Sequence, residues 1–428
     1  MYKIDEEAER EYSLSFNLKS YLLGDHTITY YGIDKVGNRE KEKTIKLYLA
    51  NYLDGFPYRA ENEINSSPNC LDIDKDGKLD ICFLDNKANL YLVDHKGKIF
   101  PNFPVSLVSS PQPMIHSLQS PALADIDDDG NIEIIVATKN KIHVLDKKGS
   151  YLPGWPKDIA GDICSSVLVY DIEEGLNSDR KAEIIVGDSS GKLHVLNYNG
   201  SYKGSKWPDT SNIGIPITKS ATIGDINLDK KLEIIIVAGS KIFAWWYCGT
   251  PLPKFPINLN SIITTEPILV DIDKDGYLEI VVGCEDGNIY IIRYDAIKSS
   301  VFRHQASGIS SIVAGDVNDD SIIEIVATTY DNKLYLLNNQ GNIFPNFPIL
   351  IPNNQQLLVT NFHLPVLADI TGNNNLEIIL WSSDKKIYAY DIQGNIVPGF
   401  PKITDGHITS SPLITDLDKD GKADLIAT

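Results

Sequence analysis

Apolar and polar positions along the chain form blocks that recur about every 50 residues. In the block that starts at Ser120, we predict a short strand at residues 122–124, a second at 132–138, a third at 141–145 and a fourth near Trp155. The second strand is apolar on both faces, which is typical of a strand covered by neighbours on both sides. The third strand alternates between polar and apolar residues, which indicates a position nearer the outside.

The recurring block predicts the fold class. Periods near 50 residues with strand-like content are typical of propeller blades, and four-stranded blades around a channel leave only short, protected edges. We therefore expect an all-β protein, a β-propeller of four-stranded blades with eight repeats, seven of them complete. An eight-bladed ring closed by an outer strand around residues 53–57 is favoured, and a seven-bladed ring and a section of a longer array are the alternatives.

An aromatic residue followed by proline closes most repeats. The ring can pack under the next blade, while proline limits hydrogen bonding at the edge of the outer strand. We interpret these pairs as structural pegs, with stacking against carbohydrate as the alternative. They are Phe56-Pro57, Phe103-Pro104, Trp155-Pro156, Trp207-Pro208, Phe255-Pro256, Phe347-Pro348 and Phe400-Pro401.

An acidic phrase precedes each second strand and carries the candidate chemistry. In four copies, carboxylates stand at positions 1, 3, 5 and 9, with glycine at position 6 for a sharp bend. Flexible oxygen ligands of this kind suit Ca²⁺, and the backbone carbonyl at position 7 would add another. With position 7 included, the four candidate sets are Asp72, Asp74, Asp76, Lys78, Asp80; Asp125, Asp127, Asp129, Asn131, Glu133; Asp271, Asp273, Asp275, Tyr277, Glu279; and Asp416, Asp418, Asp420, Lys422, Asp424.

Such phrases are also good turns between strands, which is the alternative interpretation. Four carboxylates about 5 Å apart would repel one another by roughly 3 kcal/mol per pair at an effective dielectric near 20, which is more than a turn preference returns. We therefore predict Ca²⁺ at the full copies. The phrase differs from an EF-hand loop, because position 12 holds Phe83, Val136, Val282 or Ala427 in place of a bidentate glutamate.

Four further copies are incomplete. Lys230 and Ser321 replace the glycine in two of them, and a third copy contains a four-residue insertion. Fewer anionic ligands give weaker binding, so occupancy there stays open and we expect between four and eight Ca²⁺ sites. The candidate ligands are Asp171, Glu173, Asp179, Glu183; Asp225, Asn227, Asp229, Lys231, Glu233; Asp316, Asn318, Asp320, Ile322, Glu324; and, with only two acids, Asp369, Thr371, Asn373, Glu377.

Charge and the length of the apolar runs argue against two classes of function, nucleic-acid binding and membrane spanning. The 428 residues carry a formal net charge of −19, which argues against nucleic acid as a partner because its recognition requires a basic patch. The longest apolar runs, such as residues 234–238, are strand-sized, so we expect no membrane span. Residues 1–10 are charged and do not resemble a signal peptide. Either export information lies upstream of a truncated start, which we favour, or the protein is intracellular.

The five cysteines are too few and too irregular for a disulfide scaffold. Cys70 and Cys82 lie two residues outside the first and last ligands of their loop, so a hairpin would place them opposite each other. Other repeats have Leu123 and Ile135 at these places. We therefore interpret both cysteines as small buried apolar residues, with a cross-strand disulfide as the alternative.

The acidic loop, the following apolar strand and the aromatic-proline closure recur together, and in this the chain resembles the FG-GAP or VCBS repeat proteins over residues 51–428. That class of calcium-loop propellers includes the head of integrin α subunits. The resemblance implies Ca²⁺ between the first and second strands, an extracellular or surface location and usually binding in place of catalysis. The incomplete loops depart from the pattern.

Residues 1–50 resemble the final hairpin of a bacterial surface Ig-like module, with strand-like runs at residues 24–31 and 44–49. Only half of such a module is present, and the last repeat stops after its second strand. We therefore expect the chain to be part of a larger exported polypeptide, organised as a partial Ig-like segment at 1–50 and a propeller at 51–428.

The function we predict is a non-catalytic, calcium-stabilised propeller for adhesion or for binding a protein or carbohydrate ligand. A polysaccharide-lyase-like enzyme, or an accessory domain of one, is the alternative, and an intracellular scaffold is disfavoured because cytosolic calcium is scarce. An enzyme needs titratable groups that converge in a cleft. Four equivalent positions, each nine residues before a first ligand, could line one mouth of the channel or be solvated loop residues: Glu63, His116, Asp162 and His407.

Overall fold

The computed structural model describes residues 1–10, 24–33, 39–49, 52–108, 120–173, 179–208, 213–295, 298–303, 307–352, 364–404, 406–408 and 410–428. These residues form strands, bridges and turns, and the fold is all-β, as predicted. No helix in these ranges has the length and apolar character needed to cross a membrane.

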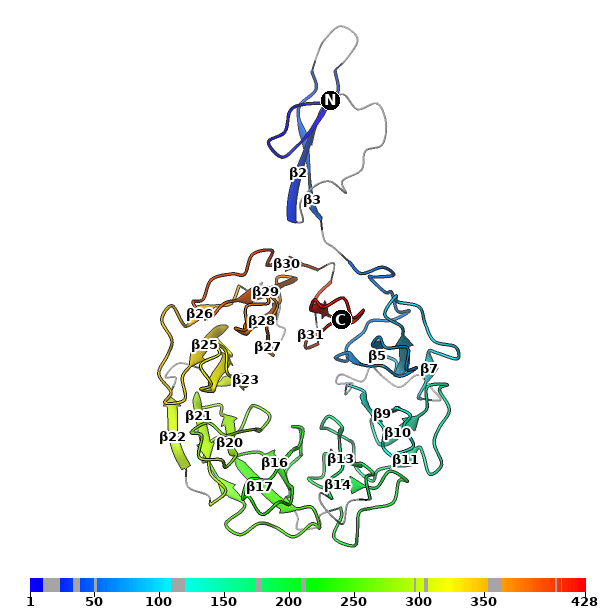
Figure 1. The fold of residues 1–428 in the computed structure, drawn as a ribbon, viewed down its shortest axis with the longest axis vertical. Coiled ribbons are helices and arrows are strands. Elements are labelled where there is room, and N and C mark those ends of the chain that lie inside the picture. Colours follow the sequence, from blue (N-terminus) through cyan, green and yellow to red (C-terminus); the bar gives the residue numbers. More distant parts are fainter. Residues whose placement is uncertain are drawn as a thin grey trace.

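The N-terminal strands form a separate antiparallel sheet. It consists of β1 (Tyr2–Ile4), β2 (Gly24–Tyr30) and β3 (Lys43–Leu49), in the order β1-β2-β3. All seven residues of β3 pair with β2, from Leu49 opposite Gly24 to Lys43 opposite Tyr30. The predicted hairpin is therefore present, and it stands outside the ring that the rest of the chain forms (Figure 1).

Eight further sheets follow one another in chain order around a ring (Figure 1). Within the described residues six of them have four strands, the third has three and the last has two. Their strands are β4 (Asn69–Leu71), β5 (Asp80–Leu84), β6 (Asn89–Val93), β7 (Val105–Ser106); β8 (Ala122–Ala124), β9 (Glu133–Thr138), β10 (Lys141–Leu145), β11 (Lys157–Asp158); β12 (Leu168–Tyr170), β13 (Glu183–Gly187), β14 (Leu193–Leu196); β15 (Thr222–Gly224), β16 (Glu233–Ala238), β17 (Lys241–Trp246), β18 (Ile257–Asn258); β19 (Ile268–Val270), β20 (Glu279–Gly283), β21 (Asn288–Ile292), β22 (Lys298–Arg303); β23 (Ile309–Gly315), β24 (Glu324–Thr329), β25 (Lys333–Leu337), β26 (Ile349–Leu350); β27 (Val366–Ala368), β28 (Glu377–Ser382), β29 (Lys386–Tyr390), β30 (Lys402–Ile403); and β31 (Leu413–Thr415), β32 (Asp424–Ile426).

The second strand of each four-stranded sheet is buried along its whole length, as its continuous apolar sequence predicts. The third strand sends alternate side chains to its two neighbours. In β25, Leu334 and Leu336 join the cluster shared with the next sheet, whereas Tyr335 and Leu337 join the cluster shared with the preceding one. Each core therefore lies between two sheets, and a blade is stable only beside its neighbours.

The aromatic-proline pairs connect successive sheets. The indole N–H of Trp155 donates to the carbonyl of Tyr198 at 2.9 Å, and that of Trp207 donates to the carbonyl of Tyr247 at 3.3 Å. Phe103 packs in the cluster that contains core residues of the following sheet. The peg interpretation is confirmed, because in each of these three cases the ring contacts the next sheet along the ring.

The last sheet contacts the first through the same bond that joins sheets elsewhere. The N–H of Leu79 donates to the carbonyl of Leu417 at 3.1 Å, just as Ala182 donates to Ile126 and Leu376 to Val317. Residues Leu53, Phe56 and Ile426 lie in one cluster with the core of β5 and β6. The segment at 53–57 therefore packs with the first and the last sheet, but it forms a turn, and the outer strand predicted there is not present among these residues.

The predicted position of two cysteines was wrong by one residue. In the pairing of β4 with β5, Cys82 lies opposite Asn69 and Cys70 lies opposite Ile81. Both thiols are free. Cys82 is fully buried in the first interblade core, which agrees with its interpretation as a small apolar residue.

Candidate metal-binding loops

Each acidic loop connects the first strand of a sheet to the second, and its backbone bends as the sequence predicts. Position 6 adopts a positive φ, from 83° to 92° at Gly77, Gly130, Gly276 and Gly421. Glycine occupies this region without steric cost, whereas other residues are disfavoured. Lys230, Ser321 and Asn374 nevertheless adopt φ values of 65°, 67° and 69° at the same position, so three incomplete loops keep the bend without glycine.

In the four full loops, the carboxylates at positions 1, 3 and 9 converge. One oxygen from each residue lies within 4.8 Å of the others in the groups Asp72, Asp74, Asp80; Asp125, Asp127, Glu133; Asp271, Asp273, Glu279; and Asp416, Asp418, Asp424. Carboxylate oxygens in a flexible loop are the ligand type that Ca²⁺ prefers. The fit of these groups to a hard divalent cation is therefore good.

Backbone N–H groups hold positions 1 and 9 in place. In the first loop, Asp72 accepts from the N–H groups of Asp76 at 3.0 Å and Gly77 at 2.9 Å. Asp80 accepts from the N–H of Ile73 at 2.9 Å through one oxygen. One oxygen of Asp80 also lies within 4.8 Å of an oxygen of Asp72 and of Asp74, so the hydrogen bonds preorient acids that are close together.

The loop at 271–279 contains buried oxygens that lack a partner. Asp271 Oδ1 and Glu279 Oε1 are both buried and form no hydrogen bond. Burial, together with the neighbouring charges of Asp273 and Asp275, raises the pKa of Glu279 to about 7. Buried polar atoms in native proteins nearly always have a partner, so two orphaned oxygens in one acidic group point to a missing cation.

The carboxylate at position 5 does not join these groups. Asp275 accepts from the N–H of Tyr277 through one oxygen and forms an ion pair of 3.2 Å with Arg293 through the other. Asp129 is similarly bound by the N–H and side-chain amide of Asn131. The structure therefore brings together three of the four predicted carboxylates and assigns the fourth to the turn.

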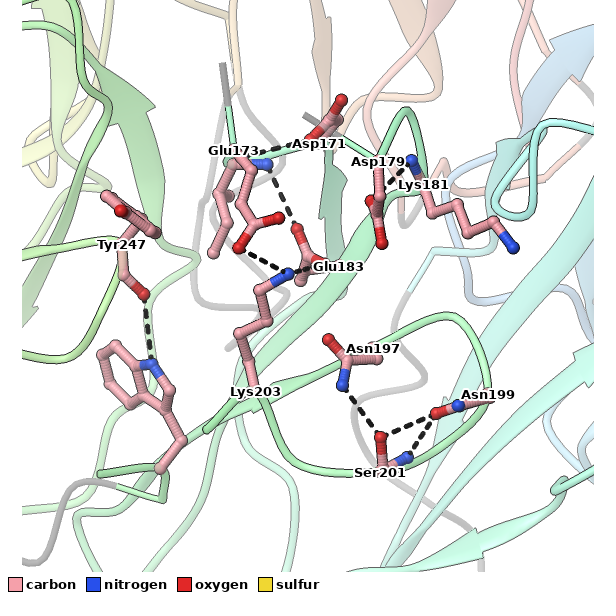
Figure 2. A network of polar contacts seen from close by, with 12 residues as sticks. Asp171, Glu173, Asp179, Lys181, Glu183, Asn197, Asn199, Ser201, Lys203 and Tyr247 are labelled. Atoms are coloured by element: carbon pink, nitrogen blue, oxygen red, sulfur yellow. Dashed lines mark hydrogen bonds and ion pairs between the residues drawn. The ribbon is translucent and has the colours of Figure 1, made fainter. Parts of the chain in front are cut away.

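In the loop at 171–183, a cation from the protein itself contacts the carboxylates. Lys203 Nζ lies 2.9 Å from Glu183 Oε1 and 3.1 Å from Glu173 Oε1, as Figure 2 shows. Burial disfavours the charged ammonium, but the hydrogen bonds to both glutamates more than offset this and raise the pKa of Lys203. Burial raises the pKa of Glu183, and Lys203 opposes that shift. Asp179 accepts from the N–H of Lys181.

Two other incomplete loops also supply a donor to the position-9 acid. Asn227 Nδ2 donates to Glu233 Oε1 at 3.1 Å, and the hydroxyl of Thr371 donates to Glu377 Oε1 at 3.0 Å. The equivalent oxygen of Glu279 has no partner. In these loops the position-3 side chain therefore satisfies the oxygen that a metal would otherwise bind.

The role of Lys203 could have been predicted from its position in the repeat, although the spacing of the acidic residues does not reveal it. The N–H of Lys203 donates to the carbonyl of Val195, the same bond that Leu152, Leu252 and Val397 form in their own sheets. Lysine thus replaces an apolar residue at a fixed place in the repeat. A lysine at a place that is apolar in other repeats needs an anionic partner, so this replacement indicates an ion pair.

The candidate channel-mouth residues are exposed where they are described, and His116 lies outside the described residues. Glu63 is 3.5 Å from the amide of Asn86, and Asp162 is 3.8 Å from Lys139 Nζ. His407 lies at the edge of an apolar pocket. Among the described residues, Glu63, Asp162 and His407 form no hydrogen bond or ion pair with one another.

Comparison with known proteins supports the fold. No protein-family model and no curated protein matches the sequence. The Dos1 propeller has a TM-score of 0.59 and 13% identity, with 85% of this chain and 90% of that chain covered. Sqt1 from Saccharomyces cerevisiae has a TM-score of 0.56 and 12% identity over 86% and 93% of the two chains. BamB from Moraxella catarrhalis has a TM-score of 0.51 and 15% identity over 84% and 95%. The chain is therefore a β-propeller.

Proposed function

We propose that this chain is a non-catalytic, calcium-stabilised β-propeller of the FG-GAP or VCBS type that binds a protein or carbohydrate ligand. The proposal places an Ig-like segment at residues 1–50 and an eight-bladed ring at 51–428. It assigns the protein to the cell surface or the extracellular space, where Ca²⁺ is abundant enough to fill loops of moderate affinity.

The observation that carries the proposal is the pair of orphaned oxygens in the 271–279 loop. Asp271 Oδ1 and Glu279 Oε1 are buried without a partner and belong to a group of acids within 4.8 Å of one another. At that distance, two ionised carboxylates repel by about 3 kcal/mol at an effective dielectric near 20. A divalent cation removes this repulsion and supplies the missing partner in one step.

The proposal assigns Ca²⁺ to the four full loops and ranks the others below them. The ammonium of Lys203 already neutralises the 171–183 loop. Asn227 and Thr371 satisfy the position-9 oxygen of two further loops. Each of these contacts would have to break before a cation could bind, and that cost lowers the affinity of the incomplete loops.

A binding role is favoured over catalysis by the candidate channel-mouth residues. Glu63, Asp162 and His407 are exposed, and the described residues give them no contact with one another. An active site requires an acid, a base and a stabilising group within reach of one substrate atom.

The direct test is thermal unfolding of the full chain in Ca²⁺ and in a chelator. We expect Ca²⁺ to raise the melting temperature and Asp273→Asn to remove part of that rise. One site contributes about 2.7 kcal/mol when Ca²⁺ is at a hundredfold excess over its Kd. In chelator the variant should be no less stable than the unaltered protein, because it removes one repelling charge.

The matched control is Asp286→Asn. Asp286 lies in the same sheet and accepts hydrogen bonds from Asn288, but it is outside the acidic loop. Its replacement should change the melting temperature equally in both conditions. Equal losses in both conditions for Asp273→Asn as well would contradict metal binding at this loop.

A further inference from the structure

Two buried histidines lie on the third strands of neighbouring sheets, His143 on β10 and His194 on β14, and both are 1% exposed. Each lies opposite the fourth residue of the second strand, Val136 or Val186. The other five sheets with a third strand have an aromatic residue at this place, which is Tyr91, Phe243, Tyr290, Tyr335 or Tyr388. The histidines therefore replace aromatic core residues by titratable rings.

A tyrosine accompanies each of these histidines. Tyr151 bridges the end of β10, and its hydroxyl oxygen lies 2.9 Å from His143 Nδ1. Tyr202 bridges the end of β14, and its hydroxyl oxygen lies 2.9 Å from His194 Nδ1. In the other described bridges at this place, the residue is Ile99, Pro251, Ile343 or Ile396. Among these bridges tyrosine occurs together with histidine, which indicates that the two side chains act as a pair.

The contacts on the far side of each ring fix which nitrogen carries the proton. Burial raises the pKa of Asp188, but hydrogen bonds from His194 and from backbone N–H groups outweigh burial and lower it, so this carboxylate only accepts. Its Oδ2 lies 2.9 Å from His194 Nε2. His143 Nε2 lies 2.9 Å from the hydroxyl of Thr138, which itself donates to the carbonyl of Lys141. Nε2 is therefore the donor in both rings, so Nδ1 accepts and the tyrosine hydroxyl donates.

The protonation states at neutral pH keep this bond in place. Burial, together with the charge of Lys141, lowers the pKa of His143 to about 4, against an opposing effect of Asp158. Burial raises the pKa of the Tyr151 phenol. The imidazole is therefore neutral and the phenol protonated. A general base acts on a proton whose heavy atom lies about 2.6–3.2 Å away, and Nδ1 of His143 satisfies this condition.

The ring of Tyr151 is also accessible from solvent, because 40% of the residue is exposed, whereas Tyr202 is half-buried. Nucleophilic attack by the phenol would require an electrophile held beside it. Removal of an electron requires only an accessible ring. Loss of an electron makes a phenol strongly acidic, so its proton must leave in the same step, and a hydrogen-bonded imidazole is the acceptor. The arrangement therefore favours oxidation over group transfer.

We propose that Tyr151 is a site of one-electron oxidation, at which the protein becomes covalently coupled to a second phenol. An external one-electron oxidant, such as a peroxidase intermediate or a metal complex, takes an electron from the ring, and the phenolic proton passes to His143 Nδ1. The phenoxyl radical then joins a radical formed in the same way from the second phenol, through a carbon–carbon bond. The ring hydrogens move to the oxygens, so each phenol loses one electron and one proton in total.

This inference goes beyond the proposed binding role and does not depend on Ca²⁺. The test treats the full chain with tris(bipyridine)ruthenium(III), produced by light and persulfate, and with N-acetyltyramine as the second phenol. Peptide mapping by mass spectrometry locates adducts with the mass of this phenol less two hydrogen atoms. Tyr170 is the internal control, because it is 45% exposed and its hydroxyl forms no hydrogen bond within the described part of the chain. We expect about tenfold more adduct at Tyr151, since a positioned base commonly contributes a larger factor.

The matched variant is His143→Phe, which removes the base and keeps an aromatic ring, as Phe243 does at the same place in another sheet. The adduct at Tyr151 should fall to the level at Tyr170, while Tyr170 itself should be unaffected. Tyr151→Phe should abolish the adduct in this peptide. Equal amounts of adduct at Tyr151 and Tyr170 in the unaltered protein, or an undiminished amount at Tyr151 in folded His143→Phe, would overturn the proposal.

A second measurement on the unaltered protein decides the question if His143→Phe does not fold. Labelling of Tyr170 should rise with the concentration of phosphate buffer at constant ionic strength, because its proton must go to a base in solution. Labelling of Tyr151 should not change, because its base is already bound. An equal buffer dependence at both tyrosines contradicts the proposal. A protein that is stabilised by Ca²⁺ but labelled equally at both tyrosines would lose this site and keep the proposed function.

Discussion

The loops at 271–279 and 171–183 occupy the same place in their sheets but neutralise their acids in different ways. In the first, Asp271, Asp273 and Glu279 converge and two buried oxygens have no partner. In the second, Lys203 reaches Glu183 and Glu173 from the segment that follows β14 in the same sheet (Figure 2). Under the proposed function, the first loop takes a cation from solution, whereas an ammonium of the protein itself contacts the acids of the second.

The difference teaches that a recurring loop can keep its backbone while its chemistry changes. Both loops retain the hydrogen bond from the position-2 N–H to the position-9 acid, at 3.1 Å for Glu279 and 3.2 Å for Glu183. That bond fixes the geometry of the turn. The second oxygen of the acid contacts an ammonium in one loop, an amide or a hydroxyl in two others, and has no partner at Glu279, where we propose Ca²⁺.

The largest expected effect comes from Lys203→Met. The variant leaves the buried carboxylate of Glu183 without its counter-charge, and losing one partner of a fully buried pair typically costs about 3–5 kcal/mol of unfolding free energy, so we expect a loss at or below the lower end of that range. We expect this loss in chelator and a smaller loss in Ca²⁺, because Asp171, Glu173 and Glu183 can then hold a cation. Urea unfolding in both conditions measures it.

The control for this variant is Lys206→Met, which removes an exposed lysine that contacts Thr250. Its effect should be small and independent of Ca²⁺. If Lys203→Met proves as mild as the control, the ammonium does not neutralise the loop and the contrast between the two loops disappears.

A smaller effect is expected from pH in the absence of metal. The pKa of Glu279 rises from an ordinary value of 4.5 to about 7 through burial, so the folded state binds more protons than the unfolded state between these values. The stability from this group is present below pH 4.5 and is lost as the pH rises to 7, by about 2 kcal/mol. Unfolding free energies from pH 5 to 7 in chelator should fall less steeply in Glu279→Gln than in the unaltered protein.

The same pH series with Glu183→Gln compares the two loops directly. Lys203 opposes the rise in the pKa of Glu183, so replacing Glu183 should flatten the pH dependence of the unfolding free energy less than Glu279→Gln does. Ca²⁺ should flatten the profile of the unaltered protein as well, since a bound cation favours ionised carboxylates. If Glu279→Gln leaves the pH dependence of the unfolding free energy in chelator unchanged, Glu279 is not held protonated in the folded state.

The smallest expected effect concerns the bend itself. Gly276 has a φ of 92° and Lys230 a φ of 65° at the same loop position. Gly276→Ala should destabilise the protein by about 1 kcal/mol, and Lys230→Gly should stabilise it by a fraction of that, because only glycine adopts such angles without strain. Thermal melts in chelator isolate the backbone effect. A loss of stability in Lys230→Gly would indicate that the lysine side chain contributes more than the strain costs.

Much of the propeller could be predicted from local sequence. The strands at 122–124 and 141–145 were predicted with their observed bounds, because apolar periodicity and turn residues are local properties. The convergence of the acids at positions 1, 3 and 9 was predicted for the same reason. Position 5 was harder to interpret from sequence. An aspartate there can bind a cation, or it can bind the N–H of Tyr277 and the guanidinium of Arg293, as Asp275 does. The residue type is the same in both cases.

The sequence by itself determined the strand pattern of each repeat, the bend at position 6 and the acids that converge in each full loop, because each of these depends on residues that are close together in the chain. Only the tertiary structure decided that Lys203 reaches the 171–183 loop, that Leu79 of the first sheet bonds to Leu417 of the last, and that an apolar pocket opens beside β32. These contacts join residues from 20 to several hundred positions apart. Their geometry is fixed by how neighbouring sheets share a core, which no single repeat can encode.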